Sequence, residues 1–228
     1  MARIAVPLLI GVAGIAILMS LGIWQVQRLD WKNGVLAAID ERIQAEPGPV
    51  PAMPNATSDL YAPVVVNGQT SGPELHVLVS HKKLGAGYRL ITRFDEVTGR
   101  SFLLDLGFVD LELKDIARPL LTGSVEGNLN WPDDRNSSTP ANDTAANIWF
   151  ARDIADMSDA LGTEPVLIVL REAEGLSDTI VPLPVDSSSI PNDHLEYAIT
   201  WFSLAFIWFG MTAYLVWRIT RLDEKGKS

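Results

Sequence analysis

The chain has 228 residues, a formal net charge of −10 and no cysteine. The lack of cysteine excludes disulfide frameworks, thiolate metal sites and thiol nucleophiles. Because an acidic protein repels nucleic-acid phosphates, no nucleic-acid partner is expected. With 47% hydrophobic residues and a mean hydropathy of +0.16, the composition indicates that some apolar residues face lipid.

An apolar segment without charged residues, residues 4–24, is predicted to form the first transmembrane helix. At about 1.5 Å per residue it crosses a hydrocarbon core of about 30 Å. A cleavable signal peptide is the alternative, but its apolar core spans only about 7–15 residues and ends in a small-x-small site. Within the segment, Gly11, Gly14, Ala16 and Ser20 supply small faces, and Ala16 and Ser20 form a small-xxx-small pair that would let a second helix approach closely.

Residues 25–54 are predicted to form a linker that begins as a helix. Val35, Leu36 and Ile39 are spaced to form one helical face. The Pro-Gly-Pro-Val-Pro run at 47–51 is expected to end the helix and to lead into the next domain.

Residues 55–190 are predicted to form a β-rich domain of the α+β class. Short runs rich in β-branched and aromatic residues alternate there with turn residues. The expected strands are 61–66, 75–80, 88–94, 102–109, 120–128 and 165–170. Their number and spacing indicate an antiparallel barrel or sandwich.

Turn residues punctuate this domain. Asn67-Gly68, Gly85-Ala-Gly87 and Thr98-Gly99 each contain a residue that tolerates positive φ, and we expect each to connect two strands. One short helix is expected over residues 152–161, with Gly162 as its C-terminal stop.

A second transmembrane helix is predicted at residues 195–217, which carry no charge after Glu196. A basic tail, residues 218–228, follows, so the positive-inside tendency places the C-terminus in the cytoplasm. Residues 25–196 hold 26 of the 28 acidic residues but only 13 of the 18 basic ones. Two spans with an acidic middle predict that both termini are cytoplasmic and that the central domain is extracytoplasmic.

Few residues offer reaction chemistry. His76 and His81, five positions apart, match no recognised metal spacing and are expected on the surface near a hairpin. No Gly-x-Ser-x-Gly or His-Glu-x-x-His motif occurs. The abundant carboxylates are expected to form mostly a solvated surface, so no catalytic site is predicted.

The third histidine lies at the entrance to the second membrane segment. If the helix starts just before it, one face carries His194, Ala198, Trp201 and Ala205. The alanines would leave a shallow slot beneath the imidazole, where a planar apolar ligand could bind with His194 as an axial ligand to iron. The alternative is an interfacial histidine in an aromatic belt with Tyr197 and Trp201, and spacing alone favours the belt.

Six motifs spread along the chain carry a family resemblance. They are Gly22-Ile-Trp-Gln-Val-Gln-Arg-Leu-Asp-Trp-Lys32, Tyr61-Ala-Pro-Val-x-x-Asn-Gly68, Gly87-Tyr-Arg-Leu-Ile-Thr92, Pro140-Ala-Asn-Asp143, Asn147-Ile-Trp-Phe-Ala-Arg-Asp153 and Asn192-Asp-His-Leu-Glu-Tyr-Ala-Ile-Thr-Trp201. In this order they resemble the surfeit locus protein 1 family, membrane-bound assembly factors of haem-copper (cytochrome c) oxidase. The resemblance covers nearly the whole chain and includes the two-helix topology.

The resemblance implies an assembly factor rather than an enzyme. It implies that subunit I of the oxidase, other oxidase assembly factors, haem A synthase and membrane lipid are the partners. In bacterial members the histidine at the head of the second helix is the proposed ligand of haem a, and His194 occupies that position. The resemblance therefore favours a haem a site with His194 as axial ligand to the haem iron, accompanied by Trp24, Tyr197, Ala198 and Trp201.

Two departures from the family pattern bear on this transfer. Leu106 stands where the family usually has an arginine, so it cannot do what that arginine does. Asp193 stands where the family usually has an asparagine, which places a carboxylate next to the imidazole of His194 and is expected to affect its basicity.

The leading hypothesis is a two-span assembly factor of the bacterial inner (plasma) membrane with a periplasmic central domain. No Arg- and Ser-rich leader precedes the first helix, which favours a bacterial over a mitochondrial location. The alternative is a haem-free scaffold that holds oxidase assembly intermediates through Trp149, Phe150 and the nearby Asn-rich loop. Since only Met19 and Met211 offer a second axial ligand in the helices, this alternative stays open.

Overall fold

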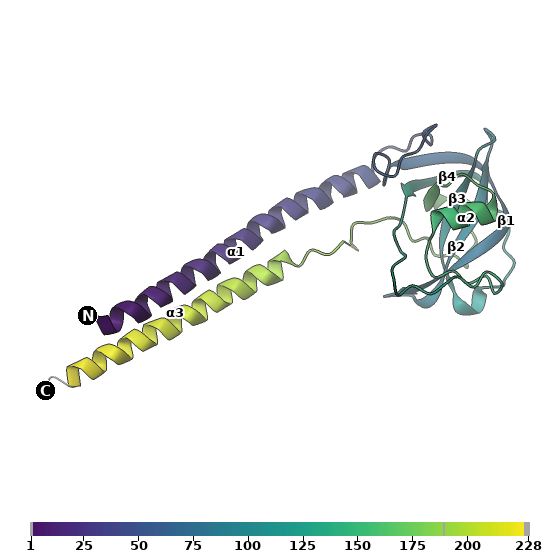
Figure 1. Cartoon of the computed structure of the whole chain (residues 1–228). Helices are drawn as coiled ribbons and strands as arrows, with labels where there is room; N and C mark the ends of the chain where they lie inside the picture. The colour runs from purple at the N-terminus through teal and green to yellow at the C-terminus, as the bar shows by residue number, and fades with distance from the viewer. Residues whose placement is uncertain (1, 189, 226–228) are drawn as a thin grey trace. The chain divides into compact units, whose positions relative to one another are not determined.

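The computed structural model describes residues 2–188 and 190–225 (Figure 1). Ser189 of the predicted central domain and residues 226–228 of the predicted tail, including Lys227, lie outside the described residues. The chain forms two compact units: a barrel unit, Ile39–Ser187, and a helical unit that contains the other described residues.

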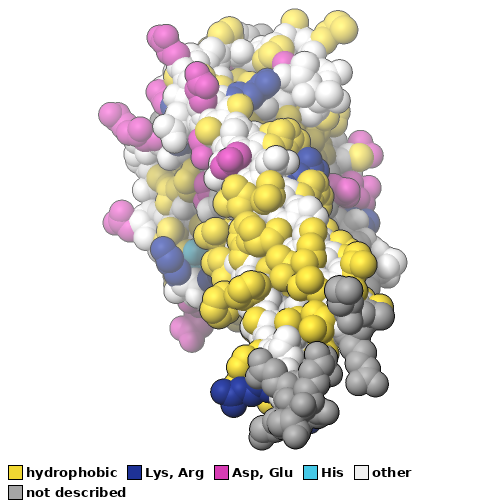
Figure 2. Space-filling model, turned by 90° about the vertical axis from the view of Figure 1, so that its left-hand side faces the viewer, with side chains coloured by type: hydrophobic (Ala, Val, Ile, Leu, Met, Phe, Trp, Pro, Cys, Tyr) yellow, Lys and Arg dark blue, Asp and Glu magenta, His cyan; other side chains and the backbone are white. Residues whose placement is uncertain are grey.

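Two helices of the helical unit are long and apolar enough to cross a membrane, α1 (Ala2–Ile43) and α3 (His194–Lys225). Only 6% of the residues in the apolar window of each helix are buried. Figure 2 shows hydrophobic side chains gathered over the surface of these helices. Because water would not solvate such a surface, both helices are suited to lipid, and membrane association follows.

α1 runs without a break through the first part of the predicted linker and ends at Ile43. At 1.5 Å per residue it is about 63 Å long, roughly twice the thickness of a hydrocarbon core. Its last turn belongs to the barrel unit, where the carbonyl of Ile43 accepts hydrogen bonds from Asn128 Nδ2 (2.9 Å) and Arg171 Nη1 (3.4 Å). A cation and an amide donor at this position satisfy the open carbonyls that end a helix.

Glycines of α1 let α3 pack against it. Close approaches occur at Gly11, Gly14 and Gly22, which face Thr212, Trp208 and Phe202, respectively. A Cβ atom at Gly14 would lie 2.4 Å from the indole Nε1 of Trp208. Ala16 and Ser20 are exposed, so the predicted contact at this pair is wrong. A helix turns about 100° per residue, and these two residues lie on a face that α3 does not cover.

The barrel unit contains five strands in a closed barrel, β1-β2-β3-β5-β4, and a short helix. The elements are β1 (Pro63–His81), β2 (Gly85–Glu96), β3 (Ser101–Asp110), η1 (Leu111–Leu113), β4 (Thr122–Asn130), α2 (Ile154–Leu161) and β5 (Leu167–Ala173). The predicted fold class, two membrane-type helices flanking a β-rich domain, is confirmed. One pair, β3 with β5, is parallel, and the chain between these two strands, which contains β4 and α2, is long enough for the crossover that parallel pairing requires.

Two predicted strands merge into β1, so Asn67-Gly68 is not a turn. A Cβ atom at Gly68 would lie 2.0 Å from the carbonyl oxygen of Asp95. Glycine is therefore needed here for the close approach of two backbones rather than for positive φ. The turn between β1 and β2 is formed by residues 82–84, so the predicted turn Gly85-Ala-Gly87 lies instead at the start of β2, with Gly85 at φ 87°. The predicted turn at Thr98-Gly99 is confirmed, with Gly99 at φ 93°. Gly162 ends α2 at φ 64°, as predicted.

β3 is buried along nearly its whole length, which explains its continuous apolar sequence. One core cluster fills the barrel and includes Phe94, Phe102, Leu104, Leu129, Ile168 and Leu170. A second cluster, around Leu103 and Leu167, lies under Met157 of α2. Core packing without disulfides therefore holds the barrel together.

His76 is 6% exposed, so its predicted surface position is wrong. Its Nδ1 lies 2.8 Å from Asn147 Nδ2, and its backbone carbonyl accepts a hydrogen bond from the amide of Trp149 (2.9 Å). The segment that contains Asn147 and Trp149 lies along β1 and covers this part of the strand. The sequence gives no local sign of that cover, because the segment is about 70 residues away along the chain.

Candidate functional site

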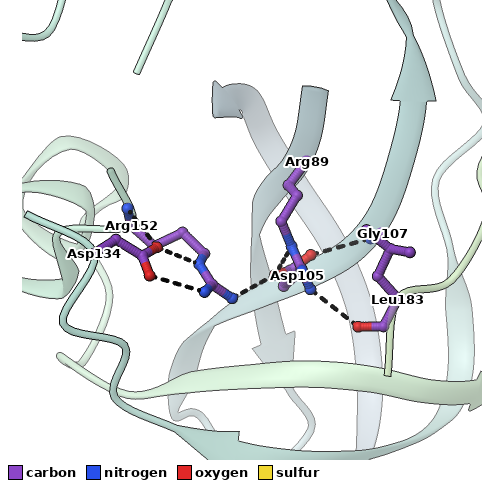
Figure 3. A network of polar contacts seen from close by, with 6 residues as sticks. All are labelled: Arg89, Asp105, Gly107, Asp134, Arg152 and Leu183. Carbon is purple, nitrogen blue, oxygen red and sulfur yellow. Dashed lines mark hydrogen bonds and ion pairs between the residues drawn. The ribbon is translucent and has the colours of Figure 1, made fainter. Parts of the chain in front are cut away.

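One polar network lies within the barrel unit, around a fully buried carboxylate (Figure 3). Asp105 Oδ2 lies 2.7 Å from Arg89 Nε and 3.8 Å from Arg152 Nη1, and its Oδ1 accepts a hydrogen bond from the amide of Gly107 (3.1 Å). Arg89 also donates to the carbonyl of Leu183 (3.0 Å). The network therefore ties β2, β3 and the segment after β5 together.

Arg152 extends the network to Asp134. Its Nε and Nη2 donate to the two carboxylate oxygens at 2.7 and 3.1 Å. Burial alone would raise the pKa of Asp134, but the hydrogen bonds and the charge of Arg152 outweigh it and hold that pKa below its usual value. Burial would lower the pKa of Arg152, but Asp134 and Asp105 outweigh it and raise that pKa. Both groups are charged at neutral pH and are unsuited to proton transfer there.

Asp105 is an exception to the expectation that the carboxylates form mostly a solvated surface. Asp105 is 0% exposed. A sequence signal was present, because Asp105 is the one charged residue in the apolar run 102–109. A carboxylate within a buried strand requires charged or hydrogen-bonding partners, although the sequence does not identify them. This network holds the loop before α2 against the barrel.

A second polar contact lies in the helical unit, between Gln25 of α1 and His194, the first residue of α3. His194 Nδ1 lies 2.8 Å from Gln25 Oε1, and Gln25 is only 8% exposed. An amide oxygen can only accept a hydrogen bond, so the neutral imidazole carries its proton on Nδ1. Its lone pair is then on Nε2.

The Nε2 atom of His194 is not fully buried. Within the described residues it has no hydrogen-bond partner, and it is not one of the fully buried polar atoms that lack a partner. The start of α3 is fixed beside it, because Asn192 Nδ2 donates to Asn33 Oδ1 of α1 at 2.9 Å. The helical unit thus presents one unpaired imidazole nitrogen at a held position.

The small residues on the predicted face of α3 are covered by α1. Ala198 and Ala205 are 2% and 3% exposed, so α1 fills the slot that was expected beneath the imidazole, and that part of the prediction is wrong. Trp201 is half-buried, whereas Trp24 and Tyr197 are 52% and 55% exposed on the outside of the helical unit. A planar ligand would therefore reach the imidazole from outside the helix contact.

The donor set at His194 fits an axial ligand to haem iron. A neutral imidazole whose other nitrogen donates to an oxygen is the usual form of a metal-bound histidine. The described residues contain no cluster of three or more His, Cys, Asp or Glu side chains that could hold a metal ion by themselves. Asp193 is exposed, and the hydrogen bond of the imidazole goes to Gln25.

The surface expected for a protein scaffold is partly buried. Trp149 is 4% exposed and packs in the second core cluster. It lines one wall of an open groove of about 800 Å³, together with Asn142 and Asn147. The groove, rather than the indole itself, is the feature that this part of the barrel offers to a partner.

Comparisons with known proteins agree over nearly the whole chain. Residues 12–206 match the SURF1 family. The SURF1-like protein of Rickettsia prowazekii (strain Madrid E) is 31% identical over 213 residues, which cover 89% of this chain and 85% of that protein. Surfeit locus protein 1 of Homo sapiens is 28% identical over 220 residues, covering 83% and 72%. The rat protein of that name is 28% identical, covering 83% and 70%. The chain belongs to the SURF1 family.

Proposed function

We propose that the protein is a membrane-anchored assembly factor for haem-copper (cytochrome c) oxidase that presents Nε2 of His194 to the iron of haem a. Membership of the SURF1 family supports the role in oxidase assembly. The observation that carries the haem part is the hydrogen bond between Gln25 and His194, because it leaves an unprotonated Nε2 that is not fully buried.

In this proposal the helices cross the bacterial plasma membrane with both termini in the cytoplasm and the barrel in the periplasm. Arg218 and Arg221 follow the apolar part of α3, and the barrel unit is acidic, which supports that orientation. His194 then lies near the outer headgroups. A haem macrocycle, apolar with charged propionates, suits this boundary between hydrocarbon and water.

Haem a is the cargo in this proposal and supplies an iron centre with an axial position to fill. The protein supplies the imidazole, fixes its tautomer and offers the exposed aromatic rings of Trp24 and Tyr197 as apolar surroundings. Its partners are subunit I of the oxidase, other oxidase assembly factors and haem A synthase. The protein holds and positions the cofactor without changing it chemically.

The test compares full-length protein purified from cells that make haem A. We expect His194→Ala to reduce the haem content at least about tenfold, because loss of a ligand removes more than a lost outer contact does. His81→Ala, a partly exposed histidine of the barrel, is the matched control and keeps the wild-type spectrum. If His194→Ala retains wild-type haem content and spectrum, the ligand assignment is wrong.

A haem-free scaffold is the second candidate. It is favoured by the packing of Ala198 and Ala205 against α1, which leaves no slot for a macrocycle beneath the imidazole. The groove beside Trp149 would then carry the contact with oxidase intermediates. A colourless protein that still co-purifies with subunit I from haem A-producing cells would support this candidate over the first.

A further inference from the structure

We infer that Gln25 is a positioning residue for His194: its amide oxygen fixes the imidazole proton on Nδ1 and so makes Nε2 the ligating nitrogen. The effect on haem rests on the proposed function. The effect on the tautomer does not, because it is a property of the haem-free protein.

The geometry favours this role. The imidazole of an unconstrained histidine carries its proton on Nε2 more often than on Nδ1, so a protein that needs Nε2 free must provide an acceptor at Nδ1. Gln25 Oε1 provides it at 2.8 Å. The acceptor comes from the other helix, 169 residues away in sequence, and not from the neighbouring Asp193.

The position of Gln25 is fixed on both sides. One turn before it, the backbone of Gly22 lies so close to Phe202 that a Cβ atom would be 2.6 Å from the ring. Two turns after it, Asn33 accepts the hydrogen bond from Asn192, two residues before the histidine. These contacts hold α1 and the start of α3 together, so the amide oxygen meets the imidazole without further ordering.

A neutral amide and a carboxylate would act differently on the same nitrogen. Both accept the Nδ1 proton, but a carboxylate draws it more strongly and makes Nε2 a stronger electron donor to a bound iron. A leucine side chain at this position accepts no hydrogen bond and so removes the preference for the Nδ1–H tautomer. Gln25→Glu and Gln25→Leu therefore change the imidazole in opposite directions, whereas a purely structural role would make both simply disruptive.

The first experiment uses the haem-free, ¹⁵N-labelled full chain in nanodiscs at a pH at which the imidazole is neutral. Long-range ¹H–¹⁵N correlation spectra report which ring nitrogen carries the proton, and His194→Ala identifies the signal. We expect Nδ1–H in the wild-type protein and in Gln27→Leu, an exposed glutamine of α1 as matched control, and Nε2–H in Gln25→Leu. An Nε2–H wild-type imidazole, or a tautomer that Gln25→Leu leaves unchanged, would overturn the inference.

The second experiment uses the protein loaded with haem a. We expect Gln25→Leu to weaken haem binding about 10–100-fold, the usual effect of losing the partner of a ligating histidine. Gln25→Glu keeps the haem but lowers its midpoint reduction potential, and Gln27→Leu changes neither. An unchanged potential in Gln25→Glu contradicts the positioning role. If the wild-type protein binds no haem, the proposed function fails while the tautomer result still decides the role of Gln25.

Discussion

The barrel and the helix pair are held together by different forces, because they are suited to different solvents. Large side chains such as Phe94, Phe102 and Ile168 are fully buried in the barrel, where exclusion of water stabilises them. In the helix pair most large apolar side chains face outward, and contact is made at Gly11, Gly14, Gly22 and two alanines. Lipid gives no comparable hydrophobic force between helices, so close backbone approach and hydrogen bonds replace it.

The polar groups of the two units also differ, because those of the barrel network are charged and those of the helix contact are neutral. The barrel contains a charged network, in which the fully buried Asp105 is paired with Arg89 and the exposed Asp134 with Arg152. The helix pair uses neutral groups, two amide side chains and an amide–imidazole pair. Every charge of the barrel network is matched by an opposite charge, whereas one nitrogen of the helix pair stays available. Under the proposed function, the available nitrogen places ligand binding in the helix pair, and the barrel network has a supporting role.

The largest expected loss of stability comes from a substitution in the charged network of the barrel. Asp105→Ala leaves the guanidinium of Arg89 buried without its carboxylate, and breaking such a pair costs about 3–5 kcal/mol of unfolding free energy. Urea unfolding of the barrel, followed by tryptophan fluorescence of the full chain in detergent, measures the loss. Asp159→Ala, an exposed carboxylate of α2, is the control and changes stability by less than about 0.5 kcal/mol. Equal effects of the two variants would contradict a structural role of the network.

The second largest expected loss of stability is in the contact between α1 and α3. Gly14→Leu places side-chain atoms where the indole of Trp208 lies and destabilises the pair by about 1–3 kcal/mol. Gly210→Leu is the matched control, because a Cβ atom there meets nothing within 4 Å. Since the chain lacks cysteine, pyrenes on cysteines introduced at the exposed residues Ala13 and Ala213 report helix separation as loss of excimer fluorescence during an SDS titration.

These two glycine variants sharpen the comparison between the units. Barrel unfolding in urea should be the same in both variants, since the contact at Gly14 belongs to the helical unit alone. If Gly210→Leu separates the helices as readily as Gly14→Leu does, the assignment of Gly14 to the contact face of α1 is wrong.

Local signals in the sequence predicted much of the fold. Apolar length marked both membrane-type helices, and Gly85, Gly99 and Gly162 marked turns or a helix end through their own backbone conformation. Asn67-Gly68 carries the same signal but lies within β1, where Gly68 is needed for the close approach of a neighbouring strand. A local pattern does not distinguish a glycine that turns the chain from one that lets another backbone approach.

The candidate site could be predicted only in part for the same reason. The sequence identified His194 and the face that it shares with Ala198, but that face is occupied by α1. The phase of one helix against another depends on the side chains of both. The small residues Gly11, Gly14, Ala16 and Ser20 are therefore all candidates from the sequence, and only the structure shows that the two glycines face α3. Gln25 stands in a recognised motif, yet its pairing with the histidine appears only in the structure.

A smaller effect on the barrel comes from acid. Hydrogen bonds from Ser101 and Ser71, together with Arg93, lower the pKa of Asp95, and hydrogen bonds from Arg100 lower that of Glu164. At neutral pH these carboxyls are ionised in both the folded and the unfolded chain, and their lowered folded-state pKa values then stabilise the fold. This contribution is lost as pH falls from about 5 through the folded-state pKa values. Each partly exposed pair contributes roughly 0.2–1 kcal/mol.

Urea midpoints measured at pH 7 and pH 3 should therefore show a less stable barrel at pH 3. Glu164→Gln removes one of the titrating groups and should reduce the difference between the two midpoints. A barrel that is equally stable at both pH values, or more stable at pH 3, would contradict the lowered pKa values. The helix contacts of Gly11, Gly14 and Gly22 with Thr212, Trp208 and Phe202 contain no titrating side chain, so excimer fluorescence provides an internal comparison.

The smallest expected effect concerns the amide pair beside the histidine. A double-mutant cycle of Asn33→Ala and Asn192→Ala should give a coupling of about 0.6 kcal/mol, the average for polar contacts between membrane helices. The SDS titration with pyrene labels measures it. This value lies well below the cost of breaking the charged barrel network, because the amides are neutral and their unpaired forms find water or headgroup partners. A coupling as large as the loss in Asp105→Ala would mean that the helix pair, like the barrel, depends on its buried polar groups for stability. The amide pair would then stabilise the helix contact as well as fix the start of α3 beside His194.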